Sequence, residues 1–328
     1  MIAAVRATST LARTAALRTA APSLSALKST VSGEWMEGEL SLDTRMVHAG
    51  VEPDERTGAI MTPVFLSTAF VQESVEKYLE KGYSYTRSGN PTVTALEARV
   101  ANMEGGAGAA CVSTGMAATT LVISGIMNSG DHCIMTDCSY GGTNRAAREH
   151  FMDKGMEFSF VDFRDHDAIK AAIKPNTKLI FSESPTNPTL NIVDMEGVSA
   201  ICKENDIVHV CDSTFATPVI CRPLDHGCDL VITSLTKYYC GHNISVGGAV
   251  IASTPELNDR MKFMQNVQGN IISPMTAYMM LQVRTVGEGW GMRGRGWWVG
   301  DRGGGDVCLN DCIYVANKAG LFGLHRVR

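Results

Sequence analysis

The sequence predicts an α/β protein built on a mainly parallel sheet of seven strands, with helices on both faces. Two observations predict this fold class. Short β-branched or apolar runs alternate with amphipathic helical segments between about residues 40 and 253. The composition, 45% hydrophobic and 19% charged, is that of a soluble protein with a large core. The length of 328 residues suggests one large or two modest domains.

Each expected strand is a short apolar run that ends at polar or turn residues. The seven strands are expected at residues 109–112, 132–135, 157–161, 178–182, 207–211, 229–233 and 248–252. Helical periodicity is expected at 92–104, 116–127, 142–154 and 194–205. Ligands of such sheets bind at the carboxyl ends of the strands, so the residues just after each strand matter most for function.

The charge and cysteine patterns argue against several classes of protein. With 29 basic and 34 acidic residues the net charge is −5, so a general affinity for nucleic acid is not expected. No apolar run reaches the roughly 18 residues of a membrane span. The ten cysteines form no CxxC pair, and we expect reduced, mostly buried thiols. The histidines lack a metal-binding spacing such as HExxH, so we expect no metal.

Residues 1–33 have the composition of a disordered transit peptide. They are rich in Ala, Ser, Thr and Leu, carry Arg6, Arg13, Arg18 and Lys28, and precede the first acidic residue, Glu34. The arginines interrupt any long apolar stretch, which argues against a secretory signal. We therefore expect mitochondrial import, with a plastid or the cytoplasm as alternatives.

The first strand leads into a small-residue turn that opens a helix at Gly115 and Met116. Free amides and the positive helix end can hold an anion there, although such turns are as often plain packing. The turn fits neither GxGxxG nor GxxxxGK[ST], which argues against dinucleotides and nucleoside triphosphates. Tyr140, which follows the second strand, is either a ring beside the same pocket or a surface side chain.

Three further strands also end at polar residues. Asn187 lies in a loop stiffened by two prolines, Asp212 follows an apolar run, and Lys237 closes another. A carboxylate buried at Asp212 requires a cation or strong donor, unless it is only a helix N-cap. Burial of Lys237 would lower its pKa, as a Schiff-base lysine needs, unless the side chain reaches the surface.

A phosphate cradle, a stacking ring, a buried acid and a buried lysine, each at a strand end, fit pyridoxal phosphate. The acid keeps the pyridine nitrogen protonated, and the lysine holds the aldehyde carbon as an imine. From spacing alone, an unrelated α/β enzyme remains an alternative.

The ordered motifs resemble the Cys/Met-metabolism pyridoxal-phosphate enzymes, and the similarity runs from about residue 44 to 281. These motifs are Tyr85-Thr86-Arg87 with Ser88 to Thr92, Tyr140 to Thr143, Ser184 to Pro188, Asp212 to Phe215, and Ser234-x-Thr236-Lys237 with Gly241-His242. The resemblance implies the type I, aspartate-aminotransferase-like fold of pyridoxal-phosphate-dependent transferases.

The resemblance also implies roles for individual residues. Lys237 would bind the cofactor covalently and then move protons, Asp212 would pair with the pyridine nitrogen, and Tyr140 would stack on the ring and assist proton transfer. Asn187 would lie near the ring hydroxyl. The remaining cofactor-binding residues implied are Gly115, Met116, Thr214, Ser234, Thr236, Tyr85 and Arg87.

Self-association follows from the same resemblance. Tyr85 and Arg87 would reach the phosphate of the neighbouring subunit, so the active unit would be a dimer or tetramer. Residues 34–70 would form the N-terminal arm that embraces the partner, and 71–270 the large cofactor domain.

The family includes several reactions. Its members remove Cα and Cβ protons, expel the γ-substituent, and either add cysteine sulfur or release a 2-oxo acid and ammonia. Residues 183–185 and 212–218 resemble cystathionine γ-synthases more than γ-lyases. Gly142 stands where methionine γ-lyases tend to carry Cys, which favours cystathionine enzymes. Methionine γ-lyase and cystathionine β-lyase are the alternatives. The expected substrates are cystathionine, O-acylated homoserine with cysteine, or methionine.

The resemblance ends near Gln282. Residues 271–282 match the start of a smaller C-terminal domain, which we expect to be largely missing, whereas 283–328 are rich in Gly, Trp and Arg without helical or strand periodicity. We interpret this tail as intron read-through or a frameshift, with an RNA-binding Arg/Gly segment as the alternative. The whole chain is then either an active enzyme or an inactive chain that retains only cofactor binding.

Overall fold

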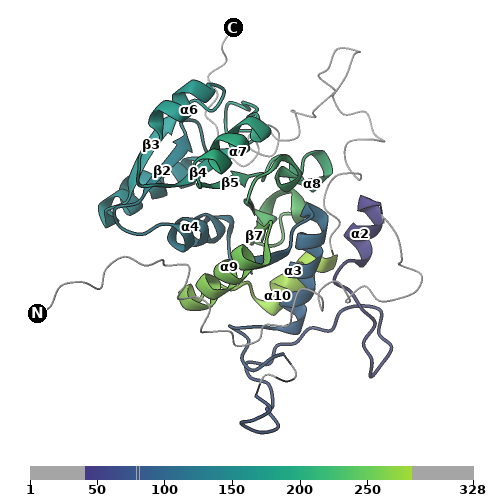
Figure 1. Cartoon of the computed structure of the whole chain (residues 1–328). Coiled ribbons are helices and arrows are strands. Elements are labelled where there is room, and N and C mark those ends of the chain that lie inside the picture. Colours follow the sequence, from purple (N-terminus) through teal and green to yellow (C-terminus); the bar gives the residue numbers. More distant parts are fainter. Residues whose placement is uncertain (1–40, 79, 81, 283–328) are drawn as a thin grey trace, which may run out of the picture.

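A computed structural model of the chain describes residues 41–78, 80 and 82–282 (Figure 1). The predicted transit peptide, 1–33, and the predicted aberrant tail, 283–328, lie outside the described residues, as does the first part of the predicted arm. All of the expected strands and helices fall within them.

The described residues form one seven-stranded sheet, in which four of the six strand pairings are parallel. The strands are β1 (Gly108–Val112), β2 (His132–Thr136), β3 (Glu157–Val161), β4 (Thr177–Glu183), β5 (Val208–Asp212), β6 (Leu230–Thr233) and β7 (Gly248–Ala252). Their order is β1-β7-β6-β5-β4-β2-β3. The predicted mainly parallel α/β sheet is therefore confirmed, and every expected strand is present within one or two residues of its predicted ends.

Helices cover the sheet on both faces (Figure 1). They are α2 (Leu42–His48), α3 (Pro91–Glu104), α4 (Gly115–Ile126), α5 (Gly141–Ala146), α6 (His166–Ala172), α7 (Met195–Glu204), α8 (Thr217–Ile220), α9 (Pro255–Gln268) and α10 (Pro274–Gln282). The helix expected at 142–154 is divided. After α5 the chain forms a π-turn, Ala147–Phe151, and a 3-10 turn, Met152–Lys154, which ends at left-handed Gly155.

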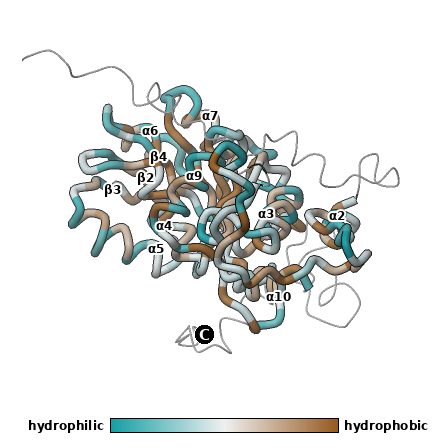
Figure 2. The backbone as a smooth tube through the Cα atoms, turned by 90° about the horizontal axis from the view of Figure 1, so that it is seen from below, coloured by the Kyte–Doolittle hydropathy of each residue, from teal (hydrophilic) through white to brown (hydrophobic). Residues whose placement is uncertain are grey.

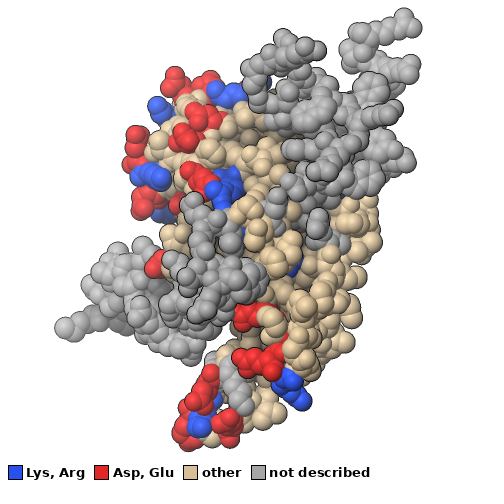
Figure 3. Space-filling model, turned by 90° about the vertical axis from the view of Figure 1, so that its right-hand side faces the viewer, with Lys and Arg blue, Asp and Glu red and all other residues tan. Residues whose placement is uncertain are grey.

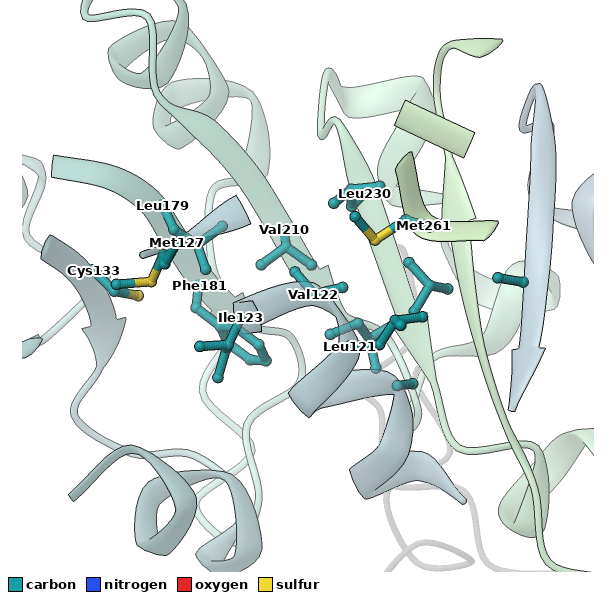
Figure 4. Close-up of a cluster of buried hydrophobic side chains, with 14 of the residues drawn as sticks. Leu121, Val122, Ile123, Met127, Cys133, Leu179, Phe181, Val210, Leu230 and Met261 are labelled. Atoms are coloured by element: carbon teal, nitrogen blue, oxygen red, sulfur yellow. The ribbon is translucent and has the colours of Figure 1, made fainter. Parts of the chain in front are cut away.

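Alternate residues of each strand enter two separate cores, as the two-residue period of a sheet requires. On one face Leu179 and Phe181 of β4 pack with Leu121 and Val122 of α4 and Met261 of α9 (Figure 4). The intervening strand residues pack on the opposite face against α3 and α10, or against α7 near β4. Figure 2 shows the hydrophobic segments toward the middle of the molecule and hydrophilic segments in the outer loops. The double coverage explains the near-continuous apolar strands in the sequence.

The direction of β7 decides where a site can form. β7 is antiparallel to both β1 and β6, so β1 points the same way as β6. The carboxyl ends of β1, β2, β4, β5 and β6 consequently meet at one edge of the sheet, the carboxyl edge. The polar residues that the sequence places after these strands are therefore gathered on one side of the molecule.

The thiols of the described residues agree with the expectation from the sequence. On the face shown in Figure 3, basic and acidic side chains of the described residues lie beside one another. Of the eight cysteines in the described residues, all are unpaired thiols and six are buried. Within residues 41–282, as far as they are described, no helix is both long and apolar enough to cross a bilayer.

A buried glutamate at the end of α3 predicts a dependence of stability on pH. Glu104 accepts a hydrogen bond from Tyr239 Oη at 2.9 Å, and burial raises its pKa from 4.5 to about 8. The unfolded chain releases this proton near pH 4.5, whereas the folded chain retains it until about pH 8. The stabilisation is full below the lower value and is lost as the pH rises through this window.

We expect the difference in unfolding free energy between wild type and Glu104→Gln to change by on the order of 4 kcal/mol across that window. Urea denaturation at intervals between pH 4.5 and 8, the two values that bound the window, measures it. Glu204→Gln, an exposed change on α7, should keep the wild-type dependence. An unchanged dependence in Glu104→Gln would show that Glu104 is not the group responsible.

Candidate active site

The first helix at the carboxyl edge begins against the loop that carries Lys237. Thr114 caps α4 by accepting a hydrogen bond from Ala117 N at 2.9 Å, and the amides of Gly115 and Met116 belong to the first turn, which has no intrahelical acceptors. A Cβ atom at Gly115 would lie 2.9 Å from Ser234 Cβ. The predicted phosphate-binding residues Gly115 and Ser234 are therefore in direct contact, and glycine is required for it.

Asp212 is connected to Ser234 through Thr214. The Thr214 hydroxyl donates to Asp212 Oδ1 at 2.6 Å and accepts a hydrogen bond from Ser234 N at 2.9 Å. The Thr214 amide donates to the same carboxylate oxygen at 3.0 Å. Because Asp212 ends β5 and Ser234 follows β6, these bonds hold two neighbouring strand ends in fixed relative position.

Two buried carboxylates lie side by side at this edge. Glu183, the last residue of β4, is the register partner of Asp212, and the side chains are 4% and 9% exposed respectively. Burial and then the neighbouring Asp212 raise the pKa of Glu183, and burial raises the pKa of Asp212 against the hydrogen bonds from Thr214. Among the described residues neither carboxylate has a cationic partner. The predicted burial of Asp212 is confirmed. No described residue supplies the cation that its burial was predicted to require.

Tyr140 follows β2 and packs over the start of α5. A Cβ atom at Gly142 would lie 2.5 Å from Tyr140 Cε1 and 2.9 Å from Met116 Sδ, so the ring and the Met116 side chain both lie against Gly142. The Tyr140 side chain is 44% exposed. The ring is thus available to a ligand and is brought beside the α4 N-terminus, as the sequence predicted.

The contact with Gly142 predicts an effect of adding a methyl group. In Gly142→Ala the new Cβ must displace the Tyr140 ring, and we expect affinity for pyridoxal phosphate to fall about tenfold with the loss of ring stacking. Titration of the cofactor by absorbance measures the affinity. Gly141→Ala is a matched control, because a Cβ there meets no atom within 4 Å. Equal weakening by both changes would contradict the role given to the ring.

The structure places Asn187 beside the same edge. Its loop follows β4, and its amide donates to Glu183 Oε1 at 2.7 Å. Glu183 itself is a site residue that the sequence interpretation missed. Its position directly after an apolar strand, the signal that identified Asp212, was sufficient to find it.

Lys237 differs from its prediction. It lies in a π-turn, Leu235–Tyr239, with non-helical backbone angles, φ −88° and ψ −117°, and its side chain is exposed. The prediction that Lys237 is buried is therefore wrong: the irregular turn that follows β6 directs the lysine away from the apolar strand. The exposed ammonium group remains accessible to a ligand at the carboxyl edge.

Three other predicted residues have partners within the chain. The Thr236 hydroxyl donates to Gly247 O at 3.1 Å, so its hydrogen is already used. Arg87 donates to the backbone and side-chain oxygens of Asn266 at 2.9 and 3.0 Å, and its guanidinium lies 5.6 Å from the Tyr85 ring centroid. Tyr85 and Arg87 are thus paired with each other and α9, and no contact among the described residues joins them to Lys237 or Asp212.

These residues fit pyridoxal phosphate on two observations of the structure. The unpartnered, buried Asp212 matches a protonated pyridine nitrogen, and the Gly115–Ser234 contact at a helix N-terminus matches a phosphate. Buried hydroxyls without a protein partner also occur near the strand ends, at Ser139, Thr143, Ser213 and Thr233. Across the described part of the chain, no group of three or more His, Cys, Asp or Glu could hold a metal ion.

The chain is similar to several proteins named as cystathionine lyases or synthases. Cystathionine beta-lyase of Coxiella burnetii is 41% identical over 243 residues, 74% of this chain and 62% of that protein. Cystathionine gamma-lyase of Bacillus subtilis is 39% identical over 245 residues, 74% of this chain and 64% of that protein. The crystal structure of cystathionine gamma synthase from Xanthomonas oryzae pv. oryzae, in complex with aminoacrylate and cysteine, has a TM-score of 0.72 and 35% identity, and covers 74% of this chain and 62% of that one.

The chain thus spans less than two thirds of the length of each of these relatives. Residues 43–287 match the family model described as Cys/Met metabolism PLP-dependent enzyme, where PLP is pyridoxal phosphate. The matched range includes every candidate site residue. The chain therefore belongs to the Cys/Met-metabolism family of pyridoxal-phosphate-dependent enzymes.

Proposed function

We propose that the chain is a pyridoxal-phosphate-dependent transsulfuration enzyme of sulfur amino acid metabolism, most like cystathionine γ-synthase or cystathionine γ-lyase. The observation that carries the proposal is Asp212, a buried carboxylate at the carboxyl edge with no cationic partner among the described residues. A cofactor with a protonated ring nitrogen supplies that cation. Relatives named for synthase and lyase activities support the same reaction class.

The candidate residues would have different roles in the reaction. The bound cofactor supplies the electron sink that stabilises negative charge on substrate carbons. Asp212 would keep the ring nitrogen protonated, and Tyr140 would stack on the ring and assist proton transfer. Lys237 Nζ would hold the cofactor and would move the proton at the substrate Cα.

The remaining residues would hold the cofactor in place. The amides of Gly115 and Met116 and the hydroxyls of Ser234 and Thr236 would bind the phosphate, Asn187 would lie near the ring hydroxyl, and Thr214 would keep Asp212 oriented. Both the hydroxyl and the amide of Thr236 donate to Gly247 O, so this residue would bind the phosphate after rotation of its hydroxyl.

Cofactor binding and substrate choice are tested on the purified chain supplied with pyridoxal phosphate. A visible absorption band that survives gel filtration is expected, and a colourless protein would overturn the proposal. Three separate incubations, with cystathionine, with O-acylated homoserine plus cysteine, and with methionine, distinguish the reactions by their products. Turnover of methionine or β-cleavage of cystathionine would favour the alternatives, methionine γ-lyase and cystathionine β-lyase.

A second candidate function is cofactor binding without turnover. It is favoured by one observation: every candidate residue above is placed to bind the cofactor, and none of the described residues is assigned to substrate binding alone. In that case the visible band is present and none of the three incubations yields product.

We further propose that the chain assembles into a dimer or tetramer, with Tyr85 and Arg87 completing the phosphate site of the neighbouring subunit. The segment before them supports an interface because it exposes large apolar side chains: Ile60 is 77%, Leu66 66%, Val71 83% and Val75 89% exposed.

Mixed assemblies test this arrangement. Arg87→Ala and Lys237→Ala chains should each be inactive alone, and their co-expression should restore activity, because one site of a mixed dimer receives both intact residues. We expect about a quarter of the wild-type turnover per subunit from statistical mixing of equal amounts, since half of the dimers are mixed and each holds one complete site. No restoration in mixed assemblies confirmed by differential tags would contradict shared sites.

The domain boundaries and the location in the cell are also proposals. We retain 34–70 as the arm, 71–270 as the cofactor domain and 271–282 as the start of a further domain. The basic, acid-free composition of residues 1–33 supports mitochondrial import. A fluorescent protein fused to these residues should accumulate in mitochondria, whereas diffuse cytoplasmic fluorescence would contradict the proposal.

A further inference from the structure

Glu183 connects two loops of the candidate site through one side chain. Its Oε2 accepts a hydrogen bond from the Tyr140 amide at 2.8 Å, and its Oε1 accepts one from the Asn187 amide at 2.7 Å. The first amide belongs to the loop after β2 and the second to the loop after β4. Each carboxylate oxygen therefore serves a different loop.

These two bonds are the main direct connection between the loops. The only other polar contacts among the described residues of the two loops involve Cys138 Sγ, which lies 3.0 Å from Thr189 Oγ1 and 4.0 Å from Asn187 O. Sulfur is a weak donor and acceptor, whereas amide bonds to a carboxylate are short and strong. The Tyr140 side chain caps no helix amide, so its place depends on its backbone.

A carboxylate at this position is costly, which argues against simple filling of space. Glu183 is 4% exposed, is adjacent in the sheet to Asp212, and has no cationic partner among the described residues. A neutral amide side chain would avoid the repulsion between the two acids, but it has only one acceptor oxygen. Because each amide meets a different oxygen of Glu183, a carboxyl group supplies both acceptors in place, whereas glutamine supplies one of them.

We infer that Glu183 is a positioning residue, which fixes the separation of Tyr140 and Asn187 across the cofactor ring by accepting both of their amide hydrogens. The inference rests on the proposed cofactor site, and it adds a residue that touches neither cofactor nor substrate in that proposal. It predicts that the geometry of both loops responds to a single change in β4.

Amide hydrogen exchange tests the inference on the cofactor-free protein. In Glu183→Gln the NH2 group faces one of the two amides and cannot accept from it. We expect at least one of the Tyr140 and Asn187 amides to exchange about tenfold faster, with the rest of β4 unchanged. Glu204→Gln, the same replacement at an exposed position of α7, should leave both amides unaffected. Unchanged exchange in Glu183→Gln would overturn the inference.

Cofactor spectroscopy supplies the second readout. We expect Glu183→Gln to weaken binding of pyridoxal phosphate about tenfold and to alter the visible circular dichroism of the bound ring, which depends on the surrounding geometry. Glu183→Asp retains the carboxylate on a side chain that is one methylene shorter. It should give a smaller change in affinity and in circular dichroism. It also keeps the test decisive if the glutamine variant does not fold.

The outcomes separate the two proposals. If wild type binds no pyridoxal phosphate, the proposed function fails and this inference fails with it. If wild type binds, and Glu183→Gln binds with the same affinity and the same circular dichroism, only the positioning role fails. Faster exchange together with altered circular dichroism supports it.

Discussion

Replacing Lys237 by alanine is expected to abolish the visible band of the bound cofactor and to lower turnover by about a thousandfold or more. The physical reason is that no other described residue of the site carries an amine that could hold the cofactor aldehyde and move the substrate proton. General acid-base catalysis alone contributes about a hundredfold to ten-thousandfold. Absorbance and steady-state kinetics with the best of the three substrates measure the two effects.

Lys178→Ala is a matched control for this change. Lys178 is an exposed lysine of β4 outside the candidate site, so its loss should leave both absorbance and turnover unchanged. Added alkylamines should partly restore the activity of Lys237→Ala if only the amine is missing. An intact visible band in Lys237→Ala would contradict the role given to this residue.

Asp212→Asn is expected to lower activity about a hundredfold and, at the same time, to stabilise the cofactor-free chain by about 1 kcal/mol. Activity falls because asparagine cannot hold a positive charge on the ring nitrogen. Stability rises because the change removes one of two adjacent buried carboxylates, while Oδ1 can still accept both hydrogen bonds from Thr214. Kinetics of the loaded enzyme and urea denaturation of the cofactor-free chain measure the pair of effects.

A fall in activity together with a rise in stability distinguishes a functional residue from a structural one. Asp162→Asn, an exposed carboxylate that pairs with Arg164, should leave activity unchanged. A loss of stability in Asp212→Asn that accounts for the whole loss of activity would contradict the proposed pairing with the cofactor.

Much of the fold was predictable because the strands are buried on both faces. Runs such as 179–181 and 248–252 are apolar throughout, and such runs are found in sheets covered by helices. The antiparallel direction of β7 was not predicted, because strand pairing depends on contacts between residues distant in the chain. The helices α6 and α9 were also not specified; α9 begins at Pro255 with Thr254 as its cap, a start signal present in the sequence.

The sequence predicted the burial of a site residue where that burial depends on the end of a single strand. Asp212 follows an apolar run and is buried, as expected. Lys237 also follows such a run, yet it is exposed, because the irregular turn after β6 has backbone angles that no residue pattern specifies. The contacts of Thr214 with Ser234, which follows β6, and of Glu183 with Tyr140, which follows β2, depend on the order of the strands in the sheet, which the sequence did not specify.

The proposed function requires that Lys237 hold pyridoxal phosphate covalently, and chemical trapping measures this attachment. The protein is incubated with pyridoxal phosphate, reduced with borohydride and digested, and the modified peptide is identified by mass spectrometry. We expect one stoichiometric adduct at Lys237 that is absent from the Lys237→Ala chain. An adduct distributed over surface lysines, or none at Lys237, would contradict it.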